Sequence, residues 1–211
     1  MQIVDQGHII VYPLTPEDWL RELKLIEDAG RTAYLSGDRI TETSHEPFIK
    51  KIIERDHGAV LEFGDMQVCF ITDRGISHEI VRHRLCSFIQ ESTRYCNYSG
   101  DKFGGELAFI KPSHDYNDGG AWDYLCRNAE KIYLELVNEY RWTPQQARSV
   151  LPNSLKTKIQ VKANFREWRH IFKLRAISKA AHPDMRRLMI PLYLQCREEC
   201  PIIFDMGEPE V

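Results

Sequence analysis

Apolar residues recur along the chain with two spacings, one typical of strands and one typical of helices. Apolar and β-branched runs at 9–14 and at 66–72 (MQVCFIT) predict strands. Apolar positions three and four residues apart predict a long amphipathic helix over about 121–140. Strands early and midway, with long helices between and after them, predict an α+β fold, with a central, mostly antiparallel sheet flanked by the helices.

Helix start signals refine this pattern. Thr15-Pro16, Pro47, Thr143-Pro144, Asn164 and Pro183 each stand before or at the start of an apolar periodic segment. Asn164 is expected to cap a helix, with Glu167 reaching back to close a capping box, and this helix is expected to continue to Arg175. Pro191 lies inside the last helical pattern, so a kink or break is expected there.

Composition narrows the class of protein. The 211 residues, 43% of them hydrophobic, suffice for one substantial core, so we expect a single domain over 1–211. A net charge of -3 argues against wholesale binding to nucleic acid, which needs a basic surface. Without an apolar run long enough to span a bilayer, or the charged-then-apolar build of a signal peptide, the sequence predicts a cytoplasmic protein with no membrane partner.

Metal-ligating residues are present, but their spacing is unfavourable. None of the six cysteines forms a Cys-x-x-Cys pair, and Cys196 and Cys200 are better explained as core residues than as zinc ligands. The segment HEIVRH resembles a zinc-protease helix, yet His78 and His83 are five residues apart instead of four. We therefore expect no metal.

A dense polar motif, RHRLCSFIQESTRY at 82–95, carries the strongest chemical signal. It is expected to leave a helix and enter extended chain, and it combines three arginines, a histidine and two serines. Guanidinium and hydroxyl groups together suit an anion with several oxygens. Cys86 and Cys96 are candidate nucleophiles, although small buried cysteine is the better interpretation of each. A Gly-rich dinucleotide or phosphate loop is not found, which argues against Rossmann and Walker sites.

The motif residues Arg82-His83-Arg84, Ser87, Ser92 and Arg94 resemble the R-H-R-x-x-S-x(4)-S-x-R signature of flavin-dependent thymidylate synthases. The resemblance extends to 57–63, 147–152 and 164–175, and covers about 45–205. It implies an enzyme that converts dUMP to dTMP, with methylenetetrahydrofolate as carbon donor, FAD as redox carrier and NADPH as reductant. It also implies a homotetramer whose sites are shared between subunits.

The resemblance further implies roles for individual residues. Arg175 corresponds to the family's pyrimidine-facing arginine and is the expected catalytic residue. The residues expected to bind dUMP are Glu79, Arg82, Gln90, Glu91, Ser92, Thr93, Arg94, Arg148 and Arg175, with Glu91 and Thr93 contributing backbone groups. The residues expected to bind FAD are Ala59, Arg82, His83, Arg84, Gln90, Asn164, Arg166 and His170. The sequence departs from the family pattern at Ile89, Ala59 and Phe63.

Two other classes of function remain open at this point. A non-catalytic nucleotide-binding module could keep the same residues without turnover. A single-stranded nucleic-acid binder could stack bases on Tyr95, Tyr98 and Phe103, but it would need a broader basic surface than the net charge allows.

Overall fold

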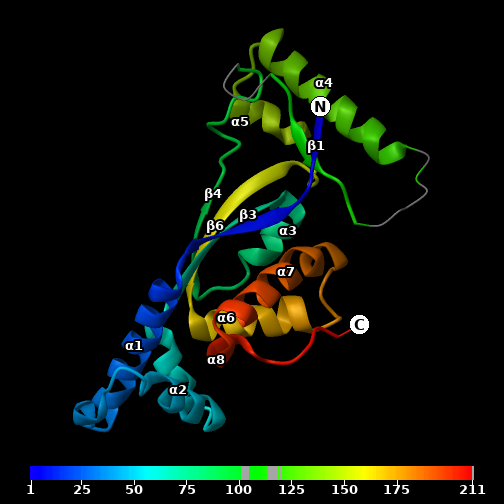
Figure 1. Cartoon of the computed structure of the whole chain (residues 1–211). Coiled ribbons are helices and arrows are strands. Elements are labelled where there is room, and N and C mark those ends of the chain that lie inside the picture. Colours follow the sequence, from blue (N-terminus) through cyan, green and yellow to red (C-terminus); the bar gives the residue numbers. More distant parts are fainter. Residues whose placement is uncertain (101–104, 114–117, 119, 211) are drawn as a thin grey trace. The chain divides into compact units, whose positions relative to one another are not determined.

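The computed structural model of the protein describes residues 1–100, 105–113, 118 and 120–210 (Figure 1). Its strands are β1 (Gln2–Val4), β2 (Gly7–Tyr12), β3 (Asp65–Asp73), β4 (Cys86–Gln90), β5 (Ala108–Ile110) and β6 (Lys156–Asn164). Its α-helices are α1 (Pro16–Ala33), α2 (His45–Glu54), α3 (Arg74–Ile80), α4 (Ala121–Asn138), α5 (Pro144–Ala147), α6 (Phe165–Phe172), α7 (Pro183–Glu199) and α8 (Pro201–Phe204). Shorter helical turns are η1 (Gly37–Arg39), η2 (Gly58–Phe63), η4 (Arg148–Val150) and the π-helical η5 (Lys173–Ile177).

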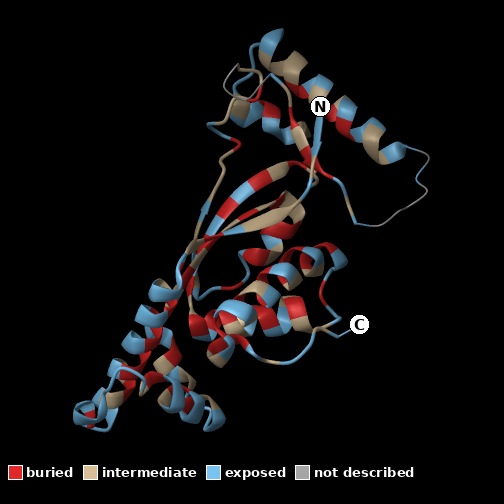
Figure 2. Ribbon diagram, in the orientation of Figure 1, coloured by how far each residue is buried: buried red, intermediate tan, exposed pale blue. Residues whose placement is uncertain are grey.

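The described strands form two sheets. The larger is mostly antiparallel and has the order β2-β3-β6-β4, which confirms the predicted α+β class. The smaller pairs β1 with β5 in parallel. Every second residue of β3 is buried, and β6 alternates in the same way, as the alternating colours of β6 in Figure 2 show. A strand with this alternation buries one face only.

Contacts group the chain into two compact units. The first unit contains Met1–Gly7, Phe70–Arg82 and Ile89–Ile159, and the second contains His8–Cys69, His83–Phe88 and Gln160–Val211. The division falls inside β3, β4 and β6, so each of these strands contributes residues to both units. The expectation of one domain over 1–211 stays a prediction.

The first unit has a core built under α4. The buried residues of this core are Tyr98, Leu107, Phe109, Cys126, Tyr133, Ala147 and Leu155. Leu125 and Ile132, which share the predicted apolar pattern, are 54% and 44% exposed. The predicted position of this helix is therefore confirmed. The stripe of buried side chains along it is narrower than the apolar pattern suggested, because the helix is covered along one side only.

The second unit has an aromatic core. Phe204 of α8 lies with its ring centroid 5.5 Å from that of Phe165 and 5.6 Å from that of Phe172, and Trp19 of α1 lies 5.8 Å from Phe165. Such ring pairs stabilise a core beyond the burial of their area. This core fixes α6, and α6 carries several of the predicted site residues.

The helix ends show where local sequence signals were sufficient. Thr15 caps α1 and closes a capping box with Asp18, while α2 begins at His45, two residues before the predicted start. Helix α7 continues through the exposed Pro191 to Glu199, so the helix does not break there, while the expected kink stays a prediction. Leu188 and Leu192 are buried on either side of Pro191, and their packing holds the helix together despite one missing hydrogen bond.

Cys196 and Cys200 are 0% and 2% exposed, which confirms that they are core residues. In the described part of the chain, no helix is both long and apolar enough to cross a membrane.

Candidate functional site

The polar motif lies where a helix passes into a strand, as predicted. Helix α3 ends at Ile80, Arg82 to Arg84 follow in a turn, and β4 begins at Cys86. His78 and His83 are therefore not on the same helix, which removes the geometry that a zinc-protease motif needs. The division between the two units falls directly after Arg82, so the motif contributes separate groups of residues to each unit.

The residues expected to bind dUMP lie in the first unit, except for Arg175. Thr93, in the turn after β4, is 5% exposed, and its hydroxyl accepts a hydrogen bond from Arg148 Nη1 at 3.2 Å. Arg82, Arg94 and Arg148 are exposed. None of the three forms an ion pair with an acidic side chain in the described part of the chain. Guanidinium groups that are exposed and have no acidic partner suit a phosphate ligand.

Gln90 and Glu91 have structural partners already. Gln90 Nε2 donates to Ser77 Oγ at 2.8 Å and to Thr157 Oγ1 at 3.2 Å. Both N–H bonds of this amide are then used, so Gln90 can offer a ligand only its carbonyl oxygen.

The backbone N–H of Glu91 donates to Lys158 O at 2.8 Å, and its carboxylate accepts from Lys156 Nζ at 3.0 Å. Strand β6 thus holds this turn in place. If the backbone group that Glu91 is expected to offer dUMP were its amide, this hydrogen bond to Lys158 would have to open. A carbonyl contact from Glu91 would not require this.

The residues expected to bind FAD, apart from Arg82 and Gln90, lie in the second unit. Asn164 caps α6, because its Oδ1 accepts a hydrogen bond from the backbone N–H of Glu167 at 2.9 Å. Arg166 Nη1 lies 2.6 Å from Glu62 Oε1 on η2. A Cβ at Gly58 would lie 3.2 Å from Arg166 Nε, so the glycine gives Arg166 room beside η2. Ala59, Arg84 and His170 are exposed, which leaves them accessible to a ligand.

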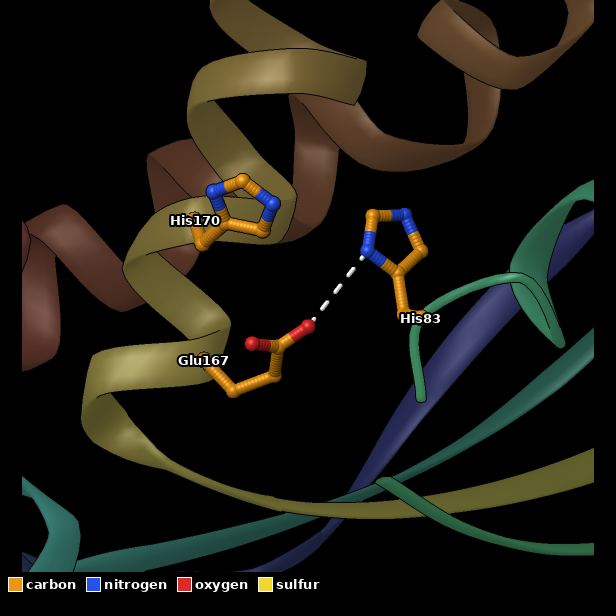
Figure 3. Close-up of side chains that lie close together, drawn as sticks. All are labelled: His83, Glu167 and His170. Carbon is orange, nitrogen blue, oxygen red and sulfur yellow. Dashed lines mark ion pairs between the residues drawn. The ribbon is translucent and has the colours of Figure 1, made fainter. Parts of the chain in front are cut away.

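A cluster of two buried side chains and one exposed side chain joins the motif to α6 within the second unit. Figure 3 shows His83, Glu167 and His170 pointing toward one another. His83 is 7% exposed and Glu167 is 6% exposed, and His83 Nδ1 lies 3.5 Å from Glu167 Oε1. On the other side of the ring, Arg175 Nε donates to His83 Nε2 at 3.3 Å. The cluster therefore contacts the expected catalytic arginine directly.

Electrostatics fix the charge of His83. Burial, together with the cation of Arg175 and with His170, lowers the pKa of His83 to about 4. The imidazole is then neutral at neutral pH. Burial also raises the pKa of Glu167, while His170 acts in the opposite direction.

The same three side chains offer ligand atoms to a metal ion, all within 4.8 Å of one another. Zn²⁺ would require them to approach to about 3.3 Å, since its bonds to nitrogen are about 2.0–2.1 Å in a tetrahedral site. A dication would also be repelled by the guanidinium of Arg175, which occupies the second nitrogen of His83. The arrangement fits a hydrogen-bonded cluster better than a metal centre.

Two expectations about α6 are corrected by the structure. The helix gives way to the π-helical η5 after Phe172, so Asn164 and Arg175 are not on one uninterrupted α-helix. Such π turns are rare and often occur at functional sites. Glu167 does not close the predicted capping box, because its carboxylate turns toward His83 instead.

Glu167 is therefore a site residue that the sequence did not reveal as one. A usable signal was its position three residues before His170, which places both side chains on one side of the helix.

The two candidate nucleophiles, Cys86 and Cys96, are both free thiols of intermediate burial. Burial and the nearby carboxyl of Glu167 raise the pKa of Cys86 to about 12. A thiol with such a pKa is hardly ever the thiolate that nucleophilic attack requires. Cys96 is half-buried. Phe103, one of the proposed base-stacking residues, lies outside the described residues.

Comparison with known proteins places these residues in a family. The family model described as "Thymidylate synthase complementing protein" matches residues 17–202. The chain belongs to this family. The resemblance stated from the sequence is thereby confirmed, together with the expectation of an enzyme of the methyltransferase class.

Curated members of the family resemble the chain over most of its length. The flavin-dependent thymidylate synthase of Corynebacterium aurimucosum is 30% identical over 86% of this chain and 78% of its own. That of Mycobacterium sp. (strain JLS) is 31% identical over 97% and 88% respectively. Among solved structures, the UMP/dUMP methylase PolB from Streptomyces cacaoi, bound with 5-Br dUMP, has a TM-score of 0.77 at 19% identity, over 97% of this chain and 96% of that one. At this identity the likeness supports the fold only.

Proposed function

We propose that the protein is a flavin-dependent thymidylate synthase that methylates dUMP to dTMP. The observation that carries this proposal is the signature arginine set of the first unit. Arg82, Arg94 and Arg148 are exposed and have no acidic partner among the described residues, as a binding site for a nucleotide phosphate requires. The curated relatives named above bear the same activity in their names.

The second unit has groups that fit a flavin. Arg84 is an exposed cation for a pyrophosphate, His170 is an exposed ring on α6, and Asn164 starts that helix, whose first amides favour an anion. When bound, FAD would carry reducing equivalents from NADPH to the carbon unit that methylenetetrahydrofolate donates. Ala59 can offer only backbone groups, and Arg166 would act together with Glu62, its ion-pair partner.

Arg175 has the chemistry for the reacting ring itself. A permanent cation beside the uracil stabilises negative charge that develops on the pyrimidine as it is methylated. The hydrogen bond from its Nε to His83 fixes one edge of the guanidinium. We assign Arg175 as the catalytic residue and propose a homotetramer, as in the family, in which subunits share the flavin and nucleotide sites.

A non-catalytic nucleotide-binding module is the second candidate. It would bind dUMP through the same arginines and release it unchanged. Arg175 argues against it, because a guanidinium held in place by a buried histidine suits the reacting ring, whereas binding of the nucleotide phosphate does not require it.

The proposal is tested by purifying the protein and recording its absorption spectrum. We expect a yellow protein with oxidised-flavin bands, migrating as a tetramer, that forms dTMP when given dUMP, methylenetetrahydrofolate and NADPH. The double variant Arg94→Ala, Arg148→Ala leaves every residue expected to bind FAD in place, so it should keep the flavin bands and lose dUMP binding. A colourless protein that takes up no added FAD would contradict the proposal, and a yellow protein that binds dUMP without turnover would support the second candidate.

A second prediction concerns the thiols. Because burial raises the pKa of Cys86 to about 12, very little of this thiol is the thiolate at neutral pH, and we expect it not to act as the nucleophile. Cys86→Ala and Cys96→Ala should each retain most of the dTMP-forming activity and lose only packing energy. Mass spectrometry of the protein during turnover provides the check, because a uridylate adduct on either cysteine would reject the flavin route described here.

A further inference from the structure

Glu167 is a buried acid that the expected dUMP and FAD residues do not include. It occupies the third position of α6, where a glutamate commonly closes a capping box, but here only the Asn164 side chain caps the helix. Among the described residues, His83 alone lies within ion-pair distance of the Glu167 carboxylate, with 3.5 Å between Nδ1 and Oε1. Burying a carboxylate is costly unless it is paired, so its position calls for an explanation in terms of His83.

The proton on His83 can be assigned from its neighbours. Arginine keeps its protons under all ordinary conditions, so Arg175 Nε must be the donor in its 3.3 Å bond to His83 Nε2. His83 Nε2 must then present a lone pair. In a neutral imidazole the single proton is therefore on Nδ1, which faces Glu167 Oε1 at 3.5 Å.

We propose that Glu167 is a positioning residue that orients Arg175 through His83. The carboxylate accepts a hydrogen bond from the Nδ1–H group of His83. This keeps the ring in the tautomer whose Nε2 accepts a hydrogen bond from Arg175. The Nε–H bond of Arg175 is thereby directed at a buried, neutral acceptor, which limits rotation of the guanidinium plane. The π turn of η5 brings Arg175 to this position from the end of the helix that carries Glu167.

The proposal rests on the function proposed above, in which Arg175 faces the pyrimidine. Two measurements distinguish the positioning role of Glu167 from the proposed function of the protein. The tautomer of His83 can be measured in the folded protein without nucleotide or turnover, so it can contradict the positioning role while dTMP is still formed. Conversely, a protein that forms no dTMP but shows the expected tautomer would contradict the function and not the hydrogen-bond chain.

The first experiment labels the histidines with nitrogen-15 and assigns the His83 signals by their loss in His83→Gln. At pH 7.5 we expect His83 to be protonated at Nδ1 and unprotonated at Nε2. In Glu167→Ala the ring loses its acceptor, and the two nitrogen signals should move toward each other as both tautomers become populated. A wild-type His83 protonated at Nε2 would overturn the proposal.

The second experiment compares kinetics at matched FAD occupancy. Glu167→Ala should lower kcat by about tenfold, as loss of a group that orients an active residue typically does, while KM for dUMP changes less than threefold. Glu167→Gln, whose carbonyl oxygen can still accept from Nδ1, should keep the tautomer and retain kcat within about threefold of wild type. Wild-type kcat in Glu167→Ala would reject the positioning role.

A matched control separates positioning from stability. Glu27, in α1, is 1% exposed and pairs with Arg31, with no contact to the His83 cluster. Glu27→Gln makes the same chemical change to a buried acid and should retain kcat even where it lowers the melting temperature. If Glu167→Ala does not fold, Glu167→Gln and the wild-type tautomer decide, because a tenfold lower kcat in a folded Glu167→Gln with unchanged tautomer would contradict the proposal.

Discussion

Arg175→Ala is expected to lower the rate of dTMP formation by about a hundredfold. The reason is electrostatic: a cation placed beside the ring before reaction stabilises the developing charge without reorganisation, and removing one such group costs on the order of 3 kcal/mol. The side chain is held by His83 in the second unit, which keeps it in place before the substrate binds. Flavin content and tetramer assembly should survive, since Arg175 takes no part in the aromatic core that fixes α6.

Three design points make this test sharp. Arg175→Lys should restore little activity, because a compact ammonium cannot donate to His83 and to the pyrimidine as a planar guanidinium can. Lys173→Ala removes an exposed cation from the same π turn and serves as the matched control, expected to keep near wild-type turnover. The assay belongs near pH 8, because losing Arg175 removes one of the causes that lower the pKa of His83. Near-normal turnover in Arg175→Ala, with FAD occupancy matched, would remove this residue from the catalytic site.

Local sequence signals predicted the elements that depend on local physics. Thr15 and Asn164 cap helices as their side chains suggested, and the β-branched run 66–72 lies inside β3. The motif passes from α3 into β4 as expected. Caps and strand propensity act within a few residues, so the sequence contains the needed information in one place.

What the sequence could not predict depends on residues that are distant along the chain. Strand β6 is an exception: it is absent from the expectations, although its alternation of polar and buried residues is a strand signal that the sequence contains locally. Glu167 was expected to close a capping box with Asn164, but its carboxylate lies beside His83, which is 84 positions earlier in the chain. The π turn at Arg175 depends in the same way on packing that no periodicity records.

The protonation of His83 is expected to have a large effect on how the free energy of unfolding depends on pH. In the folded protein the pKa of His83 is lowered to about 4, while an unfolded chain has the ordinary value of 6.5. Between these values the unfolded state binds the additional proton, so the free energy of unfolding rises with pH across this window and falls as the solution is acidified. From pH 7.5 to pH 5.0 the loss from this one residue is expected to be about 2 kcal/mol.

Urea unfolding at pH 7.5 and pH 5.0, at one protein concentration and without ligands, tests this expectation. His83→Gln cannot take up the proton. Between pH 7.5 and pH 5.0 the decrease in its free energy of unfolding should therefore be about 2 kcal/mol smaller than the decrease in wild type. Glu167 has a raised pKa and contributes with the opposite sign, but it is present in both proteins and largely cancels in the difference.

His57→Gln removes an exposed imidazole and measures how far any histidine replacement changes the pH dependence. Equal losses in wild type and His83→Gln would mean that His83 is not held neutral in the folded protein. The assigned tautomer, and with it the orientation of Arg175 by Glu167, would then lose its basis.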